Sequence, residues 1–286
     1  MSFPVAVKVA LTNMKGGVGK STLAVNLAWG VASQHGVVRR VLVVDIDPQF
    51  NASQYLLGAR RYEASVVDSD APTIWDIFEQ NTRVPGRPRA KVDTNAAVRK
   101  IIDYQDGSCV HLIPSRLELA FSLKHPGHKD ALLARAVSEI EPDYDLILFD
   151  CPPTESILTN AAYLASDQLL IPVKPEYLSS IGLGLLATSI AEFRREQPAS
   201  KLKVTGIVFN HLNPDTSGET RASKDQVRAL AARRRWRVFD AEVPYSRSFP
   251  KGAREGQPLF RTSYSRYTMA ARVREFVSEF CRAVGL

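Results

Sequence analysis

Short apolar runs alternate along the chain with segments in which apolar residues recur every three to four positions. The runs predict buried strands, because a strand covered on both faces of a sheet is apolar at every position. We expect strands over residues 5–11, 40–44, 110–113, 146–149, 169–173 and 204–209. The helical spacing predicts helices over residues 21–33, 130–140, 179–196 and 268–284.

Strands that alternate with helices predict an α/β fold, in which a mostly parallel, twisted sheet is doubly wound with helices on both faces. No internal repeat and no interdomain linker is visible, so we expect a single domain over residues 1–286. Residues 58–97 lack clear periodicity and contain Pro72, Pro85, Pro88 and a basic run. We expect this segment to be an insertion on the surface of the domain.

Charge is distributed unevenly along the chain. The whole sequence carries 37 Lys+Arg against 30 Asp+Glu, a formal net charge of +7. Residues 201–286 hold 17 of the basic and 8 of the acidic side chains, so the excess positive charge lies entirely in the last third. A localised positive field suggests a polyanionic partner such as DNA or an anionic membrane, although a basic face can also serve solubility alone.

The cysteines and histidines offer little chemistry of their own. Cys109, Cys151 and Cys281 are too few and too scattered for a disulfide framework or a four-cysteine metal site, which favours a reducing interior. Cys151 is expected to be a buried thiol rather than a nucleophile. His125 and His128 enclose a proline and a glycine, which is typical of a surface turn rather than of a metal site. No apolar stretch is long enough for a transmembrane helix.

The segment KGGVGKST, residues 15–22, follows a predicted strand and precedes a predicted helix, as a phosphate-binding loop requires. Its glycines let the backbone turn so that several N–H groups point inward. Lys20, at the start of the helix, would reach the β- and γ-phosphates of a nucleotide, and Ser21 would offer its hydroxyl to Mg²⁺. The candidate nucleotide-binding residues of this loop are Lys15, Gly16, Gly17, Val18, Gly19, Lys20, Ser21 and Thr22.

A second lysine opens this loop, and KGGVGKS thereby resembles the deviant Walker A motif of the ParA/MinD family of P-loop ATPases, most closely its ParA-type, Soj-like members. The resemblance implies that Lys15 reaches across a dimer interface to the phosphates held by the partner subunit. A cation delivered in this way can stabilise the charge on a transferring phosphoryl group, as an arginine finger does. We therefore expect a homodimer in the ATP state, with Lys15 and Lys20 as catalytic residues.

The segment VLVVDIDPQFNAS, residues 41–53, resembles the family's switch I element. Two aspartates there lie at the end of a predicted strand, where a ligand site of an α/β sheet is expected. The resemblance makes Asp47 the third catalytic residue, which positions the attacking water. Asp45 is assigned to the Mg²⁺ shell or to orienting the loop. Phe50 replaces the glycine that is usual in the family.

Three later segments extend the resemblance. LILFDCPP, residues 146–153, resembles switch II, and Asp150 is expected to bind Mg²⁺ through water at the end of a buried strand. The metal residues implied are thus Ser21, Asp45 and Asp150. Asn210, in GIVFNHLNP, and Pro244, in a loop that resembles the family's final adenine-side segment, are candidate adenine contacts, although an ordinary turn would explain either residue equally well.

The basic last third is the candidate DNA-binding surface, because contacts to phosphates need only positive charge on one face. Trp236 is expected to anchor a helix to the core rather than to stack on a base. The candidate DNA-binding residues are Arg221, Lys224, Arg228, Arg233, Arg234, Arg235, Arg237, Lys251 and Arg254, with Arg261 and Arg266 as further basic positions.

The resemblance implies a cytoplasmic, nucleoid-associated partition ATPase that uses ATP and Mg²⁺. It would bind non-specific double-stranded DNA in its ATP state, segregate or position plasmid or chromosomal DNA, and hydrolyse ATP slowly until a ParB-like protein stimulates it. One alternative is a MinD-like ATPase that cycles on a membrane, but the C-terminal helix is better suited to packing on the sheet. The other is a nucleotide-gated DNA-binding scaffold with little hydrolysis. The short segment before the loop leaves no room for a helix-turn-helix, so sequence-specific binding is not expected.

Overall fold

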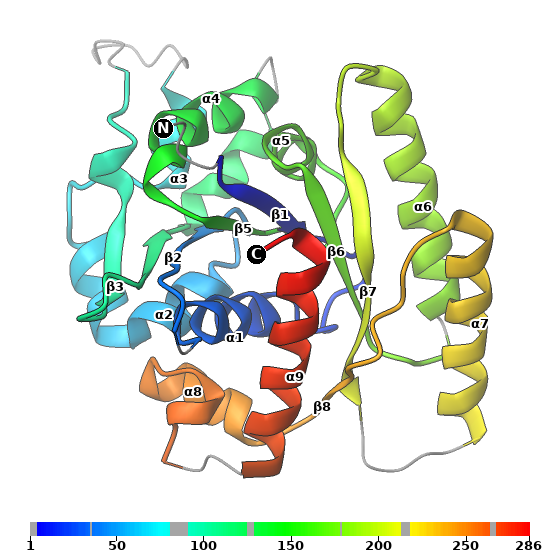
Figure 1. The fold of residues 1–286 in the computed structure, drawn as a ribbon. Coiled ribbons are helices and arrows are strands. Elements are labelled where there is room, and N and C mark those ends of the chain that lie inside the picture. Colours follow the sequence, from blue (N-terminus) through cyan, green and yellow to red (C-terminus); the bar gives the residue numbers. More distant parts are fainter. Residues whose placement is uncertain are drawn as a thin grey trace.

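One sheet runs through the middle of the protein (Figure 1). The computed structural model describes residues 5–34, 36–80, 91–124, 129–177, 179–212, 218–263 and 267–286. Within these ranges the sheet has eight strands in the order β3-β4-β2-β5-β1-β6-β7-β8, and every ladder except β3–β4 is parallel. The strands are β1 (Val7–Leu11), β2 (Arg40–Asp45), β3 (Arg99–Asp103), β4 (Cys109–Ile113), β5 (Leu146–Asp150), β6 (Gln168–Val173), β7 (Lys203–Leu212) and β8 (Val243–Pro244).

Alternate residues of each central strand enter two separate hydrophobic clusters, one on each face of the sheet. In β2, Val41 and Val43 join one cluster while Leu42 and Val44 join the other, and all four are fully buried. Helices complete both layers: α1, α2, α8 and α9 pack on the first face and α3 to α7 on the second (Figure 1). They are α1 (Lys20–Ala32), α2 (Asn51–Tyr62), α3 (Ile74–Glu79), α4 (Asp130–Ile140), α5 (Ile157–Ala165), α6 (Ser179–Glu196), α7 (Gly218–Arg234), α8 (Ser248–Glu255) and α9 (Tyr267–Val284).

The predicted fold class is confirmed, and each predicted strand and helix is present with small shifts at its ends. The C-terminal helix α9 buries Val273, Phe276 and Phe280 against α1 and the sheet, as expected of a core helix. Elements that the sequence pattern missed include α2, α7 and the edge strand β3. Helix α7 buries only Ser223, Val227 and Ala231, so its apolar stripe is too sparse to predict a helix.

The expectation that residues 58–97 lie on the surface is wrong for part of this segment. Its helix α3 begins at a capping box formed by Thr73 and Asp76, and it buries Ile74, Ile77 and Phe78 almost completely in the core. Short helices of four to six residues show little periodicity, which is why the pattern here resembled a loop. Residues 81–90, with Pro85 and Pro88, lie outside the described residues, as do His125 and His128.

The parallel strands bring their carboxyl ends to one edge of the sheet, and this edge assembles the candidate site. Strand β5 lies between β1 and β2, so that Asp150 pairs in register with Leu11 on one side and with Asp45 on the other. The loop between β1 and α1, the ends of β2 and β5, and the loop after β6 therefore meet at this edge.

Candidate nucleotide-binding site

The loop from β1 to α1 has the backbone of an anion cradle. Gly17 and Gly19 have φ of 74° and 81°, in the left-handed region that favours glycine. A Cβ on Gly19 would lie 2.6 Å from Asn210 Nδ2, so this position also excludes a side chain sterically. The side chain of Asn210 is buried and donates to the carbonyl oxygen of Val18 at 2.8 Å. Strand β7 thus supports the loop from behind.

The ammonium of Lys20 lies inside this loop. Its Nζ donates to the carbonyl oxygen of Asn13 at 3.1 Å and to that of Lys15 at 3.5 Å. Burial lowers the pKa of Lys20, and the nearby carboxylate of Asp150 opposes that shift. A cavity of about 360 Å³ opens at the loop, and its lining is Gly16, Gly17, Gly19, Lys20, Ser21, Thr22, Asp47, Gln49, Asn51, Tyr55, Pro153, His211 and Ala253.

Asp150 is the most unusual side chain of the site. It is fully buried, and neither carboxylate oxygen has a hydrogen bond of good geometry among the described residues, although Ser21 and Lys20 lie close enough to stabilise its charge in part. Burial and the neighbouring Asp45 raise its pKa well above the ordinary range, and Ser21 and Lys20 offset only part of this rise. A buried carboxylate that is stabilised only in part is costly unless a further cation binds it, so Asp150 fits a hard divalent cation such as Mg²⁺.

The aspartate that ends β2, Asp45, and the one that follows it, Asp47, are organised differently. Asp45 accepts hydrogen bonds from the backbone and hydroxyl of Ser53, at 2.8 and 2.7 Å, and from the backbone of Asp47 at 3.1 Å. Its pKa is raised to about 7, chiefly by burial. These bonds hold the start of α2 and support the loop-orienting alternative for Asp45. Asp47 lines the cavity and accepts a bond from the backbone of Gln49 at 2.9 Å, and burial raises its pKa.

Phe50, in place of the family's glycine, keeps the backbone conformation that a glycine would adopt. Its φ is 45° and its ψ 32°, a left-handed conformation that is strained for a bulky residue. The ring stacks on Tyr62, with centroids 5.1 Å apart and an interplanar angle of 14°. This stacking offsets part of the backbone strain.

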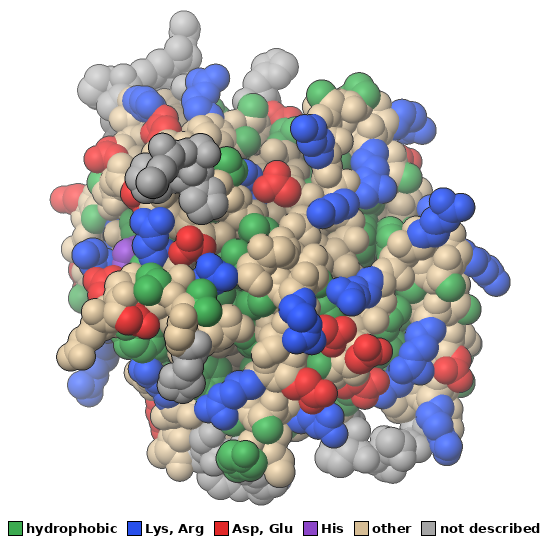
Figure 2. Space-filling model, in the orientation of Figure 1, with side chains coloured by type: hydrophobic (Ala, Val, Ile, Leu, Met, Phe, Trp, Pro, Cys, Tyr) green, Lys and Arg blue, Asp and Glu red, His purple; other side chains and the backbone are tan. Residues whose placement is uncertain are grey.

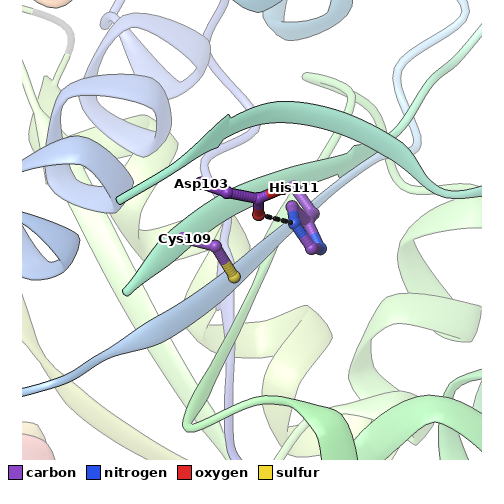
Figure 3. Close-up of side chains that lie close together, drawn as sticks. All are labelled: Asp103, Cys109 and His111. Carbon is purple, nitrogen blue, oxygen red and sulfur yellow. Dashed lines mark hydrogen bonds and ion pairs between the residues drawn. The ribbon is translucent and has the colours of Figure 1, made fainter. Parts of the chain in front are cut away.

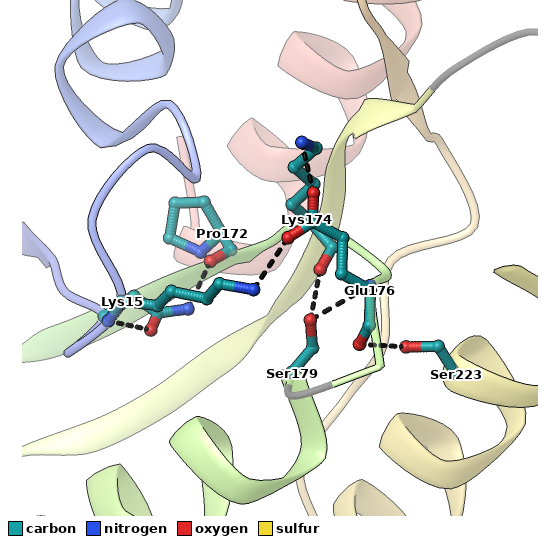
Figure 4. Close-up of polar contacts among 7 residues, drawn as sticks. Lys15, Pro172, Lys174, Glu176, Ser179 and Ser223 are labelled. Atoms are coloured by element: carbon teal, nitrogen blue, oxygen red, sulfur yellow. Dashed lines mark hydrogen bonds and ion pairs between the residues drawn. The ribbon is translucent and has the colours of Figure 1, made fainter. Parts of the chain in front are cut away.

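Lys15 is held within its own chain (Figure 4). Its Nζ forms an ion pair with Glu176 Oε2 at 2.7 Å, and its backbone N–H donates to Asn13 Oδ1 at 2.9 Å. The other carboxylate oxygen of Glu176 pairs with Lys174, and the two lysines lower the pKa of Glu176. The Glu176 carbonyl accepts a bond from Ser223 on α7. Sequence reasoning did not find Glu176, because no motif marks it.

Other residues of the site also escaped the sequence analysis. His211 lines the cavity next to Asn210, and burial lowers its pKa. Asn26 of α1 is fully buried, donates to Tyr55 of α2 and accepts from the backbone of Leu259. Cys151 is a buried free thiol, as predicted. Pro244 lies on the short edge strand β8, outside the cavity lining, and its adenine contact, like that of Asn210, stays a prediction.

The geometry agrees with comparisons to known proteins. A family model described as an AAA domain matches residues 6–204, which is more than half of the chain. The chain belongs to the ParA-type P-loop ATPases. The sporulation initiation inhibitor protein Soj of Bacillus subtilis is 28% identical over 251 residues, covering 88% of this chain and 89% of that protein. The chromosome partitioning protein ParA of Myxococcus xanthus is 30% identical over 204 residues, covering 70% and 63% respectively.

The architecture matches solved structures over nearly its whole length. The ATP complex of a McdA variant from Cyanothece superposes with a TM-score of 0.76 at 20% identity, covering 98% of this chain and 97% of that one. The family match ends within β7, so Asn210, Pro244 and the basic last third of this ParA-type chain lie beyond it. The roles assigned to these residues stay predictions.

Most of the predicted DNA-binding residues of this ParA-type chain lie in two groups, one at α7 and one at α8, and some residues in each group form ion pairs within the chain. Arg221, Arg233, Arg234 and Arg235 are exposed along or just after α7, and among the described residues none has an acidic partner within ion-pair distance. Three other predicted residues are engaged in the chain: Lys224 pairs with Glu242 at 2.8 Å, Arg228 with Asp225 at 3.6 Å, and Lys251 with Glu255 at 3.3 Å.

The second group lies at α8. Arg247, which the sequence analysis omitted, lines a shallow cavity of about 430 Å³ together with Lys251 and Arg254. On the face shown in Figure 2, a group of acidic side chains interrupts the basic ones near β8 and α9. The basic side chains on this face are therefore spread over several elements and do not form one continuous patch. Arg237 lies over the Phe239 ring, Trp236 packs partly buried against the core, and Arg266 lies outside the described residues.

Proposed function

We propose that this chain is an ATP-dependent, dimerising partition ATPase that binds non-specific DNA in its ATP state. The buried and only partly stabilised carboxylate of Asp150, beside Lys20 and the phosphate loop, is the observation that carries the nucleotide part of the proposal. Its family membership supports the partition part, since relatives include a chromosome partitioning protein. A ParB-like protein is proposed to stimulate hydrolysis.

The residues present fit ATP with Mg²⁺. The loop N–H groups and Lys20 would bind the phosphates, while Ser21 and Asp150 would hold the metal. When bound, Mg²⁺ would neutralise charge that develops on the phosphoryl oxygens. Asp47 lines the same cavity and would orient the attacking water. Burial raises the pKa of Asp47, so its carboxylate would accept a proton from that water more readily than an exposed aspartate would.

Lys15 ties nucleotide binding to dimerisation. In the single chain it is paired with Glu176, so a role on the partner's nucleotide requires that pair to open. The gain would be a direct contact to phosphoryl charge, which is far stronger than a half-exposed ion pair. Loss of the γ-phosphate would remove that contact and return Lys15 to Glu176. The rate of hydrolysis would in this way set how long the dimer lasts.

Hydrolysis and dimerisation can be tested together. Phosphate release and light scattering should be measured for the wild type, Lys20→Ala, Lys15→Ala and Asp47→Ala with Mg-ATP. We expect ATP-dependent dimers in the wild type and in Asp47→Ala, with hydrolysis lost in the latter. Lys15→Ala should bind nucleotide as a monomer. A wild type that stays monomeric at saturating ATP would contradict the proposal, and a dimer without phosphate release would favour the scaffold alternative.

DNA binding has its own test. Arg233, Arg234 and Arg235 changed together to Gln should weaken ATP-dependent binding to arbitrary duplexes. The slope of log K against log[salt] should become shallower by about 0.9 for each DNA phosphate that the variant no longer neutralises. The same change at Arg247, Lys251 and Arg254 tests the second group. An affinity for DNA that is the same at low and high salt, or the same with and without ATP, would exclude ATP-dependent binding to DNA phosphates.

Helix α9 is the segment on which the MinD-like alternative depends. No helix among the described residues is both long and apolar enough to cross a membrane. Helix α9 turns its apolar residues into the core, including Met269, Val277 and Val284. An amphipathic membrane anchor would need that face to be free. Liposome flotation with ATP should therefore leave the protein in the unbound fraction.

A further inference from the structure

Three side chains of different chemistry meet at the outer edge of the sheet, away from the nucleotide site (Figure 3). Asp103 ends β3, and Cys109 and His111 belong to β4. Asp103 pairs directly with Cys109 across the antiparallel ladder, and His111 follows Cys109 by two positions. Both relations place side chains on the same face of a sheet. One carboxylate oxygen, the thiol sulfur and a ring nitrogen lie within 4.8 Å of one another.

Neighbouring groups orient these ligand atoms. Nε2 of His111 lies 2.8 Å from Asp103 Oδ1, while Nδ1 lies 2.9 Å from the hydroxyl of Tyr144. The other oxygen of Asp103, Oδ2, faces Lys100 Nζ at 3.4 Å. Oδ1 and Nε2 therefore face each other, the thiol sulfur lies within 4.8 Å of a ligand atom of each residue, and Lys100 and Tyr144 contact the pair from its other side. An outer hydrogen bond to the second ring nitrogen is typical of histidines that bind metals.

Burial is graded across the group. The Cys109 residue is 5% exposed, the His111 side chain 14% and the Asp103 side chain 50%. The thiol is therefore shielded from solvent, whereas the carboxylate is exposed, so an ion can reach the site from the Asp103 side. A cross-strand His–Asp pair alone accounts for two of the three groups, but not for a thiol placed within reach of both. Burial raises the pKa of Cys109 to about 11, which makes the thiol a poor nucleophile.

We propose that Asp103, Cys109 and His111 form a site for a divalent transition-metal ion, for which Zn²⁺ is best suited, with water in the fourth position. A set of one sulfur, one nitrogen and one oxygen ligand matches the borderline-soft preference of zinc. On binding, the sulfur–metal bond replaces the S–H bond of Cys109, and the proton leaves to solvent. Oδ1 and Nε2 must separate by about 0.5 Å, because ligands about 2.0–2.1 Å from a tetrahedral ion lie about 3.3 Å apart.

Such a site would tie the edge strand to the sheet. Strand β3 is the outermost strand on this side and pairs only with β4 among the described strands. Exposed edges are prone to fraying and to pairing with other chains, and a metal ion that bridges both strands opposes both processes. The proposal is independent of nucleotide binding, since its ligands lie outside the phosphate-loop cavity.

The site can be tested with Co²⁺ as a probe on the full, untagged chain. Excess Mg²⁺ keeps the oxygen ligands around Asp150 occupied by a hard cation. We expect one Co²⁺ per chain, a thiolate-to-cobalt charge-transfer band, and displacement by Zn²⁺. Cys109→Ser should lose the band and His111→Gln should weaken binding, whereas Cys281→Ser, which changes another buried cysteine, should keep both. Tyr144→Phe should bind about 10–100-fold more weakly, as expected for an outer-shell partner.

A folding check keeps these outcomes decisive. Zn²⁺ should raise the melting temperature of the wild type and of Cys281→Ser but not of Cys109→Ser, and all three should bind Mg-ATP equally. Absence of a charge-transfer band in a wild type that binds ATP would overturn the proposal. An identical band or an identical affinity in Cys109→Ser would show adventitious metal only, and would also overturn it.

Discussion

The ion pair between Lys15 and Glu176 yields a quantitative prediction about dimerisation. Glu176→Gln removes the negative charge that holds Lys15 within its own chain while it preserves the shape of the side chain. The Lys15 and Glu176 side chains are 32% and 40% exposed, and Nζ lies 2.7 Å from Oε2. An ion pair this exposed stabilises by about 0.2–1 kcal/mol. If each protomer opens one such pair on dimerisation, the cost to the dimer is about 0.4–2 kcal/mol.

Glu176→Gln should remove this cost. We expect the dimer dissociation constant to fall by about 2-fold to 30-fold, since 1.4 kcal/mol corresponds to about a factor of ten. Lys15 and Lys174 lower the pKa of Glu176, so the carboxylate is charged at neutral pH and the pair is fully present there. As pH falls through that lowered pKa, the pair and its opposition to dimerisation are lost, so the advantage of Glu176→Gln should shrink in acid.

Sedimentation velocity with saturating Mg-ATP measures the dimer dissociation constant. The measurement uses an Asp47→Ala background, so that ATP hydrolysis does not dissociate the dimer during the run. Glu192→Gln is the matched control, because it makes the same change at an exposed position of α6 that has no ion pair among the described residues. A Glu176→Gln dimer that is no tighter than the control would refute the competition between Glu176 and the partner's nucleotide. A weaker dimer would show that Glu176 itself contributes to the interface.

Three further predictions concern the stability of the site without nucleotide. Asp150→Asn should raise the free energy of unfolding while it weakens metal-dependent ATP binding, because it removes a buried carboxylate whose charge Ser21 and Lys20 stabilise only in part. Asp45 keeps its proton up to pH about 7 when folded, whereas an unfolded aspartate loses it at pH ~3.9. Denaturant titrations should therefore show wild-type stability falling between these pH values, and Asp45→Asn should flatten that fall. Phe50→Ala should be less stable than Phe50→Gly by about 1–2 kcal/mol, since both lose the stacking on Tyr62 but only alanine keeps the left-handed strain; equal melting temperatures would contradict this.

The central sheet could be predicted from the sequence because its strands are apolar on both faces. Val41 to Val44 and Leu146 to Phe149 are fully buried, so every position carries the same signal. Helices α2 and α7 could not be predicted in this way. Helix α7 touches the core through few residues, and α2 is interrupted at Gly58, which has φ of 69° and ψ of 161°. Their stability comes from tertiary packing rather than from their own periodicity.

The residues of the candidate site also fall into those that local sequence patterns predict and those that long-range contacts position. Lys20, Asp45, Asp47 and Asp150 could be predicted because each stands at a strand end or in a contiguous motif. Glu176 could not, since its contact to Lys15 spans 161 positions of the sequence. Asn210 could be proposed as an adenine contact, but its support of the phosphate loop, across 192 positions, could not be predicted. Contacts of this kind depend on which strands are neighbours in the sheet, and local sequence patterns do not determine the strand order.

Glu176 also connects the nucleotide edge to the basic helix α7, and the way in which it does so limits what its carboxylate can control. The bond from Ser223 of α7 goes to the backbone carbonyl of Glu176, and the backbone N–H of Glu176 donates to Ser179 of α6 (Figure 4). Glu176→Gln leaves these backbone bonds in place. Any change in DNA affinity that accompanies the substitution must then follow from dimerisation, whereas Ser223→Ala would act on α7 directly and leave the pair with Lys15 intact.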